Sequence, residues 1–282
     1  MKRASYLACL AAVTFGSLAF GQAASLRHLA PGSPGTLDWA IASYHPTHTR
    51  AVDEGSLPPQ RASGTCPADM ALVDRRFCVD RYEGSLVEVL ADKSLLPHSP
   101  YEAPEDGHTY VARSVAGVIP QGYVSAAQAQ TACGAVHKRL CNATEWRSAC
   151  GGTGGYVYPY GPTHEAARCN DRGKPPMLTL HPPTGKGWPG WGMAELNDPQ
   201  LNQLPGTLAK TGEYAGCVND LGVHDMVGNL HEWTADPNGT FQGGYYLDTT
   251  INGEGCAYRT TAHQYAYHDY STGFRCCADV GP

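Results

Sequence analysis

Cysteines are the residues of this 282-residue chain most able to carry chemistry. One stands at position 9, and ten more lie between Cys66 and Cys277. A thiolate acts as a nucleophile or as a ligand for a soft metal such as Cu(I). No Cys-x-x-Cys occurs, which argues against a zinc ribbon or a thioredoxin-type site. An even set of cysteines in an exported chain instead predicts full pairing into disulfides.

Histidine and tyrosine offer weaker signals. Among twelve histidines, the best candidate pair is His263 with His268, which stands beside Asp269, and a surface or packing role is favoured over metal ligation. Six tyrosines near the C-terminus suit either core packing or a groove for a peptide or glycan, because tyrosine combines an apolar ring with a polar tip. They are Tyr245, Tyr246, Tyr258, Tyr265, Tyr267 and Tyr270.

The composition limits the classes of protein. Charged residues make up 16% of the chain, and 33 glycines and 21 prolines indicate many loops, which excludes a coiled coil or helical bundle. A hydrophobic fraction of 42% excludes a wholly disordered chain. The net charge is −6 without a basic block, so no nucleic-acid partner is expected.

The N-terminus has the pattern of a secretory signal peptide. Lys2 and Arg3 precede an apolar run over 4–20, and small residues follow at the end of 1–23. An uncleaved anchor is the alternative, but the run is short for a membrane span. We therefore expect a secreted or periplasmic protein with no membrane span after cleavage.

The mature chain divides into a linker and one domain. Residues 24–62 are rich in Ala, Pro, Ser and Gly and contain no cysteine, which predicts a flexible linker. The domain then covers 63–282.

Short strands and two helices are expected within the domain. Apolar runs at 70–73 and 76–82 flank an Asp74-Arg75 turn, which predicts a pair of strands. Ser125 is the expected N-cap of a helix over 126–136, and Asn142 with Glu145 forms a capping box for a second helix. Because the rest is mostly loop and short strand, we expect an α+β fold with several antiparallel strands.

Several segments in order resemble the formylglycine-generating enzyme, or sulfatase-modifying factor, family. The two longest are Lys138-Arg139-Leu140-Cys141-Asn142-Ala143-Thr144-Glu145-Trp146 and the segment 221–233, which ends in Gly228-Asn229-Leu230-His231-Glu232-Trp233. The chain closes with Gly273-Phe274-Arg275-Cys276, and the resemblance covers about 66–280. It implies a disulfide-rich variant of the C-type-lectin fold with little regular secondary structure. The remaining matching segments are 77–83, 124–126 with 132–133, 158–161, 169–170 and 243–244.

Enzymes of that family oxidise a peptide cysteine to formylglycine with copper, dioxygen and a Cys-x-x-x-x-Cys pair. The pair follows the Gly-Gly motif, and soft sulfur ligands hold Cu(I). Here 245–255 contains no cysteine, and Asp248 stands about where the first thiol would be. The next cysteine, Cys256, matches a later structural cysteine. The resemblance therefore implies that copper does not bind.

The resemblance also implies calcium sites. Asp225, Gly228, Leu230 and Glu232 match one family site, whose carboxylate and carbonyl oxygens suit calcium. Turn capping by the two acids is the alternative. A second set is weaker because its alignment crosses a variable loop: Asn170, Asp171, Asp198 and Gln200.

The family's disulfide pairing gives Cys133–Cys276 and Cys150–Cys256. Each closes a loop of more than a hundred residues, for which loop entropy predicts about 4 to 5 kcal/mol. Cys66–Cys78 suits the predicted N-terminal strand pair. Cys169–Cys217 and Cys141–Cys277 follow mainly by elimination.

Two functions remain open. The first is an exported, non-catalytic binding or accessory module with calcium and disulfides as its scaffold and an unknown protein, peptide or glycan as its ligand. The alternative is a metal-dependent oxidoreductase of the formylglycine-generating type, acting on a protein cysteine or a small molecule.

Overall fold

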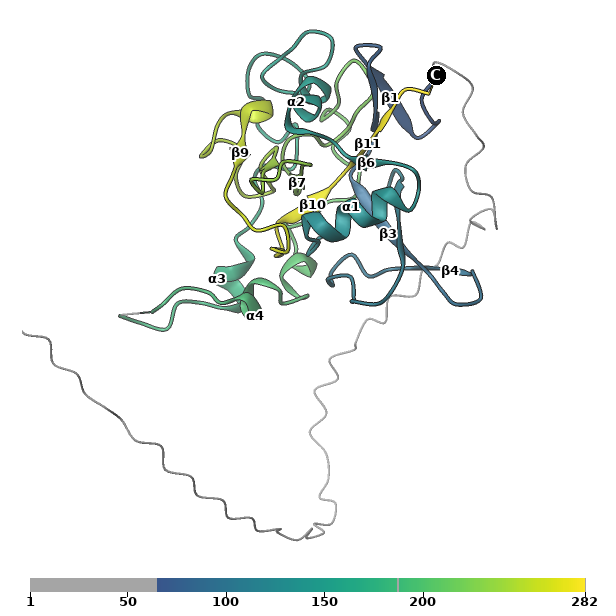
Figure 1. The fold of residues 1–282 in the computed structure, drawn as a ribbon. Coiled ribbons are helices and arrows are strands. Elements are labelled where there is room, and N and C mark those ends of the chain that lie inside the picture. Colours follow the sequence, from purple (N-terminus) through teal and green to yellow (C-terminus); the bar gives the residue numbers. More distant parts are fainter. Residues whose placement is uncertain (1–64, 187, 282) are drawn as a thin grey trace, which may run out of the picture. The chain divides into compact units, whose positions relative to one another are not determined.

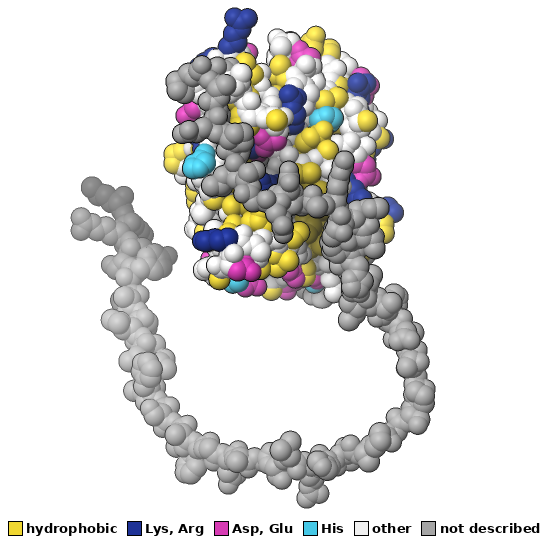
Figure 2. Space-filling view, turned by 90° about the vertical axis from the view of Figure 1, so that its right-hand side faces the viewer, with side chains coloured by type: hydrophobic (Ala, Val, Ile, Leu, Met, Phe, Trp, Pro, Cys, Tyr) yellow, Lys and Arg dark blue, Asp and Glu magenta, His cyan; other side chains and the backbone are white. Residues whose placement is uncertain are grey.

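The computed structural model describes residues 65–186 and 188–281 (Figure 1). The predicted signal peptide and the whole of the predicted linker lie outside the described residues. None of the described helices is both long and apolar enough to cross a membrane. On the face seen in Figure 2, acidic and basic side chains are interspersed with hydrophobic ones.

The first sheet joins the two ends of the domain. The predicted strand pair is present as β1 (Met70–Val73) and β2 (Phe77–Asp80), which run antiparallel. Asp74 and Arg75 both adopt positive φ in the turn between them. The C-terminal strand β11 (Cys276–Asp279) lies between β2 and the short β6 (Arg139–Leu140). Residues some two hundred positions apart in sequence are thus neighbours in one sheet.

Both predicted helices form with the expected caps. Helix α1 (Ala126–Gly134) has Ser125 as its N-cap, and α2 (Ala143–Gly151) begins with the capping box of Asn142 and Glu145. Each cap side chain accepts a backbone N–H that the first helical turn leaves unpaired. Trp146 is fully buried on the inner face of α2.

Two further sheets complete the core. The first is antiparallel, with the order β4-β3-β5, and packs near α1. The second has the order β10-β7-β8-β9. Most strand pairs are antiparallel, as expected, and β10 in addition pairs parallel to β7. The residues between them return the chain to the same end of the sheet, which a tight hairpin does not do. The strands are β3 (Gly84–Val89), β4 (Leu95–Pro97), β5 (Tyr110–Ser114), β7 (His231–Trp233), β8 (Phe241–Gln242), β9 (Arg259–Thr260) and β10 (Thr272–Phe274).

Loops dominate the middle of the chain. Between α2 and β7 the described residues form short helices and no strand, and Figure 1 places two of these helices, α3 and α4, at the lower left of the domain. A long loop region without its own core requires other links, and disulfides provide them here. The short helical elements are α3 (Pro176–Leu180), α4 (Met193–Leu196), η1 (Leu201–Gln203) and, later in the chain, η2 (Gly255–Ala257).

Candidate functional site

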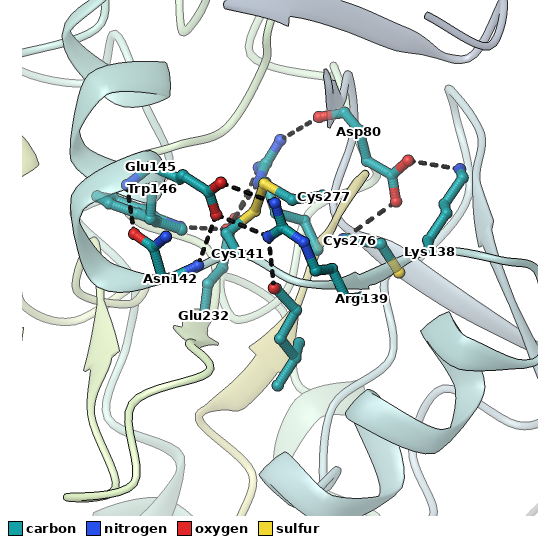
Figure 3. Close-up of a disulfide and its surroundings, with 12 residues drawn as sticks. Asp80, Lys138, Arg139, Cys141, Asn142, Glu145, Trp146, Glu232, Cys276 and Cys277 are labelled. Carbon is teal, nitrogen blue, oxygen red and sulfur yellow. Dashed lines mark hydrogen bonds and ion pairs between the residues drawn. A yellow bond between two sulfur atoms is a disulfide. The ribbon is translucent and has the colours of Figure 1, made fainter. Parts of the chain in front are cut away.

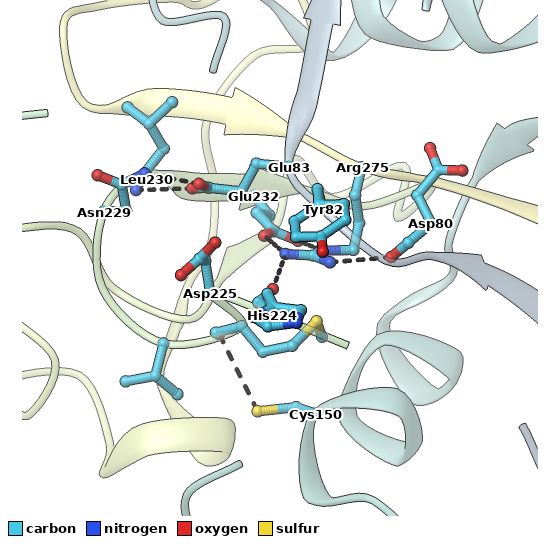
Figure 4. A network of polar contacts seen from close by, with 12 residues as sticks. Asp80, Tyr82, Glu83, Cys150, His224, Asp225, Asn229, Leu230, Glu232 and Arg275 are labelled. Atoms are coloured by element: carbon cyan, nitrogen blue, oxygen red, sulfur yellow. Dashed lines mark hydrogen bonds and ion pairs between the residues drawn. The ribbon is translucent and has the colours of Figure 1, made fainter. Parts of the chain in front are cut away.

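A fully buried ion pair lies where the three core segments meet. Arg275, just before β11, directs two guanidinium nitrogens at Glu232 of β7, each 2.6 Å from a carboxylate oxygen (Figure 4). Trp146 of α2 donates its indole N–H to the same carboxylate at 2.6 Å. The side chains of Arg275 and Glu232 are 0% and 1% exposed. The pair therefore ties α2, β7 and the start of β11 together in a region that bulk solvent does not reach.

Arg275 also organises the backbone around it. Nη1 donates to the carbonyl oxygen of Asp80 at 3.0 Å, and Nη2 donates to that of His224 at 2.9 Å. The carboxylate of Asp80 accepts from Lys138 at 2.6 Å and from the backbone N–H of Cys276 at 3.1 Å (Figure 3). Burial raises the pKa of Asp80 to about 6, against the opposing effect of Lys138.

Two more buried carboxylates surround this ion pair. Glu83 accepts from the side chain of Asn229 at 2.6 Å and from the backbone N–H of Leu230 at 3.2 Å. Asp225 accepts from the backbone N–H of Gly212 at 2.6 Å. Burial raises the pKa of Asp225 to about 7, and burial together with Asp225 and Glu232 raises the pKa of Glu83 well above its usual value. Among these three carboxylates, only Glu232 is thus hydrogen-bonded to the guanidinium of Arg275, whose charge also acts on the other two.

The first predicted calcium set lies within this network. The carbonyl oxygens of Gly228 and Leu230 and Oδ1 of Asp225 accept no hydrogen bond within the described part of the chain. Both oxygens of Glu232, by contrast, are engaged by Arg275 and Trp146. Within residues 65–186 and 188–281, no group of three His, Cys, Asp or Glu side chains is arranged as a metal cage. The set therefore offers three open oxygens, while Glu232 would have to leave its present partners.

The second predicted calcium set is divided between two places. Asn170 donates to Asn229 and Thr207 in the core, and Asp171 accepts from His164. Asp198 instead contacts His181 and the backbone of Gln200 beside η1. Among the described residues, no hydrogen bond or ion pair joins the side chains of Asn170 or Asp171 to those of Asp198 or Gln200.

One protein-family model matches the chain. The model described as "Sulfatase-modifying factor enzyme 1-like domain" matches residues 97–280, which is more than half of the chain. The chain belongs to this family. The resemblance drawn from the sequence motifs is thereby confirmed.

Several solved structures match part of the chain at low identity and with TM-scores below 0.5. The Major Tropism Determinant I1 variant is 13% identical with a TM-score of 0.44, over 76% of this chain and 53% of that one. The U1 variant is 15% identical with a TM-score of 0.41, over 78% and 54%. A crystal structure of CarF is 20% identical with a TM-score of 0.29, over 68% and 57%. This chain therefore spans about half the length of the solved structures it matches. No curated protein matches it.

The expected fold class is confirmed. The domain belongs to the sulfatase-modifying factor family and combines helices and short strands with little regular structure. Ten cysteines of the described chain are joined in the five pairs that the sequence analysis gives. They are Cys66–Cys78, Cys133–Cys276, Cys141–Cys277, Cys150–Cys256 and Cys169–Cys217.

The segment in which the family's enzymes carry their two active cysteines has a carboxylate and no free thiol in this chain. Asp248 stands in a turn, where its carboxylate accepts from the backbone N–H groups of Thr250 and Ile251 and from the hydroxyl of Tyr258. Cys256, the nearest cysteine, is bonded to Cys150. Because the described chain presents no unpaired thiol, its residues do not fit a copper–dithiolate centre, and no oxidation step is derived for it.

The histidine pair and the six C-terminal tyrosines do not gather into one site. His268 contacts Asn197, whereas His263 packs against Phe241 and Tyr267 with ring centroids 4.7 Å away from each. The two histidines therefore have different surroundings. Of the six tyrosines, Tyr246, Tyr258 and Tyr270 are buried and serve packing, while Tyr245, Tyr265 and Tyr267 remain partly exposed.

Sequence reasoning assigned no role to Glu83 or Arg275, although both stand inside the motifs that carry the resemblance. The available signal was a charged residue next to apolar and cysteine residues, as in Phe274-Arg275-Cys276-Cys277. Such a charge is either exposed or paired within the core. Its partner, Glu232, lies 43 positions away and emerges only from the tertiary structure.

Proposed function

We propose that this family member is an exported, non-catalytic binding or accessory module. The pairing of every described cysteine is the observation that carries the proposal, because the family's oxidation requires two thiolates. The cysteine-free segment 245–255 supports the same conclusion. A disulfide-rich domain also suits an oxidising compartment outside the cytoplasm.

A direct assay distinguishes this role from the oxidoreductase alternative. Purified protein is incubated with a cysteine-containing sulfatase-type peptide, Cu(I) and dioxygen, and the peptide mass is recorded. We expect no formylglycine, with a copper-loaded family enzyme as the positive control. An aldehyde product that disappears in a Cys150→Ala/Cys256→Ala variant would establish the oxidoreductase alternative.

We further propose that calcium binds beside the Arg275–Glu232 pair. With Glu83, Asp225 and Glu232 ionised, the three carboxylates carry two more charges than one guanidinium neutralises. A divalent cation at Asp225, Gly228 and Leu230 would compensate this excess with oxygen ligands. When bound, calcium would supply structural charge compensation only.

Calcium is expected to stabilise the protein in a pH-dependent way. Without a cation, the raised pKa of Asp225, about 7, lets the folded state keep a proton that the unfolded state releases above pH 4, so stability falls as pH rises from about 4 to about 7. Calcium at a hundredfold excess over Kd adds about 2.7 kcal/mol, or roughly 5–10 °C in Tm. We expect this shift at pH 8 and little of it at pH 5.

The control is an Asp225→Asn variant, which should unfold at the same temperature in EDTA and in calcium. An Asp198→Asn variant should keep the shift. Equal Tm values for the wild type in EDTA and in calcium at pH 8 would refute the site.

A further inference from the structure

A pocket of about 570 Å³ lies between the turn after β7 and the segment after β9. One wall contains Ala235, Pro237 and Asn238, and the other contains His263, Gln264 and Tyr265 beside Ala262. The pocket is separate from the carboxylate network and from segment 245–255. Its volume is in the range of pockets that bind small ligands.

The two walls are fixed to one another by backbone contacts. Ala262 donates to the carbonyl oxygen of Asn238 at 3.0 Å, and His263 donates to that of Gly239 at 3.2 Å. Gly239 has φ +66°, and a Cβ there would lie 1.5 Å from the carbonyl oxygen of His263. Only glycine permits this close approach. The pocket is therefore formed before any ligand arrives.

The lining combines apolar surface with several polar groups and carries no Asp, Glu, Lys or Arg side chain. It presents two amides, an imidazole and a phenol hydroxyl among alanine and proline. An ionic ligand would lose its hydration without gaining an opposite charge, and an apolar ligand would leave the amides unpaired. A ligand that is neutral and rich in hydrogen-bonding groups satisfies both conditions.

Several of these polar groups are available. Among the described residues, no hydrogen bond engages the imidazole of His263, the side-chain amide of Gln264 or Oδ1 of Asn238. The His263 ring is held by Phe241 and Tyr267, so it keeps its position without a polar partner. Tyr265 is half-buried and adds a ring of the kind that packs against apolar ligand faces.

We propose that this pocket binds an uncharged saccharide. Hydroxyl groups would pair with the amides and the imidazole, and the apolar face of a sugar ring would lie against Tyr265 and Pro237. The inference rests on the proposed role as a binding module and specifies the class of its ligand.

Binding to a printed array of neutral and sialylated oligosaccharides tests the proposal, followed by calorimetric titration with the best-bound neutral sugar. We expect neutral sugars to bind and their sialylated forms to bind no better. Gln264→Ala should weaken binding at least about fivefold, the size of one lost neutral hydrogen bond. Gln264 is exposed and makes no side-chain hydrogen bond within the described chain, so this variant should fold normally. Gln203→Ala, an exposed glutamine outside the pocket, is the matched control and should leave binding unchanged.

Absence of saccharide binding, or binding that Gln264→Ala leaves unchanged, would overturn the saccharide proposal. Binding of a peptide that Gln264→Ala weakens, without any saccharide binding, would also overturn it but would leave the binding role intact. Formation of formylglycine in the assay above would remove the non-catalytic role whatever the sugar result.

Discussion

Replacing Arg275 with methionine should destabilise the domain by about 3–5 kcal/mol, the range for a broken buried ion pair. The variant leaves the carboxylate of Glu232 buried without its guanidinium, and the carbonyl oxygens of Asp80 and His224 lose their donors. Chemical denaturation monitored by tryptophan fluorescence measures the change. Trp146 is a direct reporter because its indole contacts Glu232.

Arg168→Met is the matched control for Arg275→Met. Arg168 pairs with Glu165 at 2.7 Å with both side chains substantially exposed, and it donates to the carbonyl oxygen of Gly216 at 3.0 Å, so a loss of at most about 2 kcal/mol is expected. A double variant, Arg275→Met with Glu232→Leu, should recover part of the loss, because it removes the stranded charge. A loss under 1 kcal/mol for Arg275→Met alone would contradict the central position of this pair.

The second large effect concerns two disulfides that share a loop. Cys133–Cys276 and Cys141–Cys277 close loops of 143 and 136 residues. Their N-terminal cysteines, however, are only 8 positions apart, and their C-terminal cysteines are adjacent in sequence. While one bond remains, the other closes a ring of only about ten residues. Each single removal should therefore cost about 3 kcal/mol, below the 4 to 5 kcal/mol expected from loop length alone.

Removing both bonds should cost about 7 kcal/mol. Once the first bond is removed, the remaining bond closes a larger ring, whose other end is held by Cys150–Cys256. The loss from removing both bonds therefore exceeds the sum of the two single losses by about 1 kcal/mol. Paired Cys→Ala variants measured in denaturant give these values. Cys66–Cys78 closes an independent loop of 12 residues and should add to either bond without coupling. Single losses near 5 kcal/mol would contradict the shared-loop account.

Local features were predictable from the sequence because their signals are local. Ser125 and Asn142 mark helix starts by their own hydrogen bonds, and the Asp74-Arg75 turn lies between its two strands. The position of β11 between β2 and β6 was not predictable in this way. Its pairing depends on segments far apart in sequence, which no local pattern specifies.

In the candidate site, too, residues within one motif were predictable, whereas contacts between distant segments were not. Asp225 and Glu232 could be named from one motif, but the engagement of Glu232 by Arg275 and Trp146 depends on three separate segments meeting. Glu83 joins them from a fourth segment. The pocket beside His263 depends on a backbone contact between two turns, which only the folded chain shows.

The state of the ten cysteines from Cys66 to Cys277 tests the central claim most directly. Purified protein is alkylated with iodoacetamide in denaturant without a reductant, digested and mapped by mass spectrometry. We expect no alkylated cysteine in this range and a peptide in which Cys150 is joined to Cys256. Two alkylated thiols, Cys256 among them, would contradict it, because a free Cys256 would make a thiolate available for oxidase chemistry.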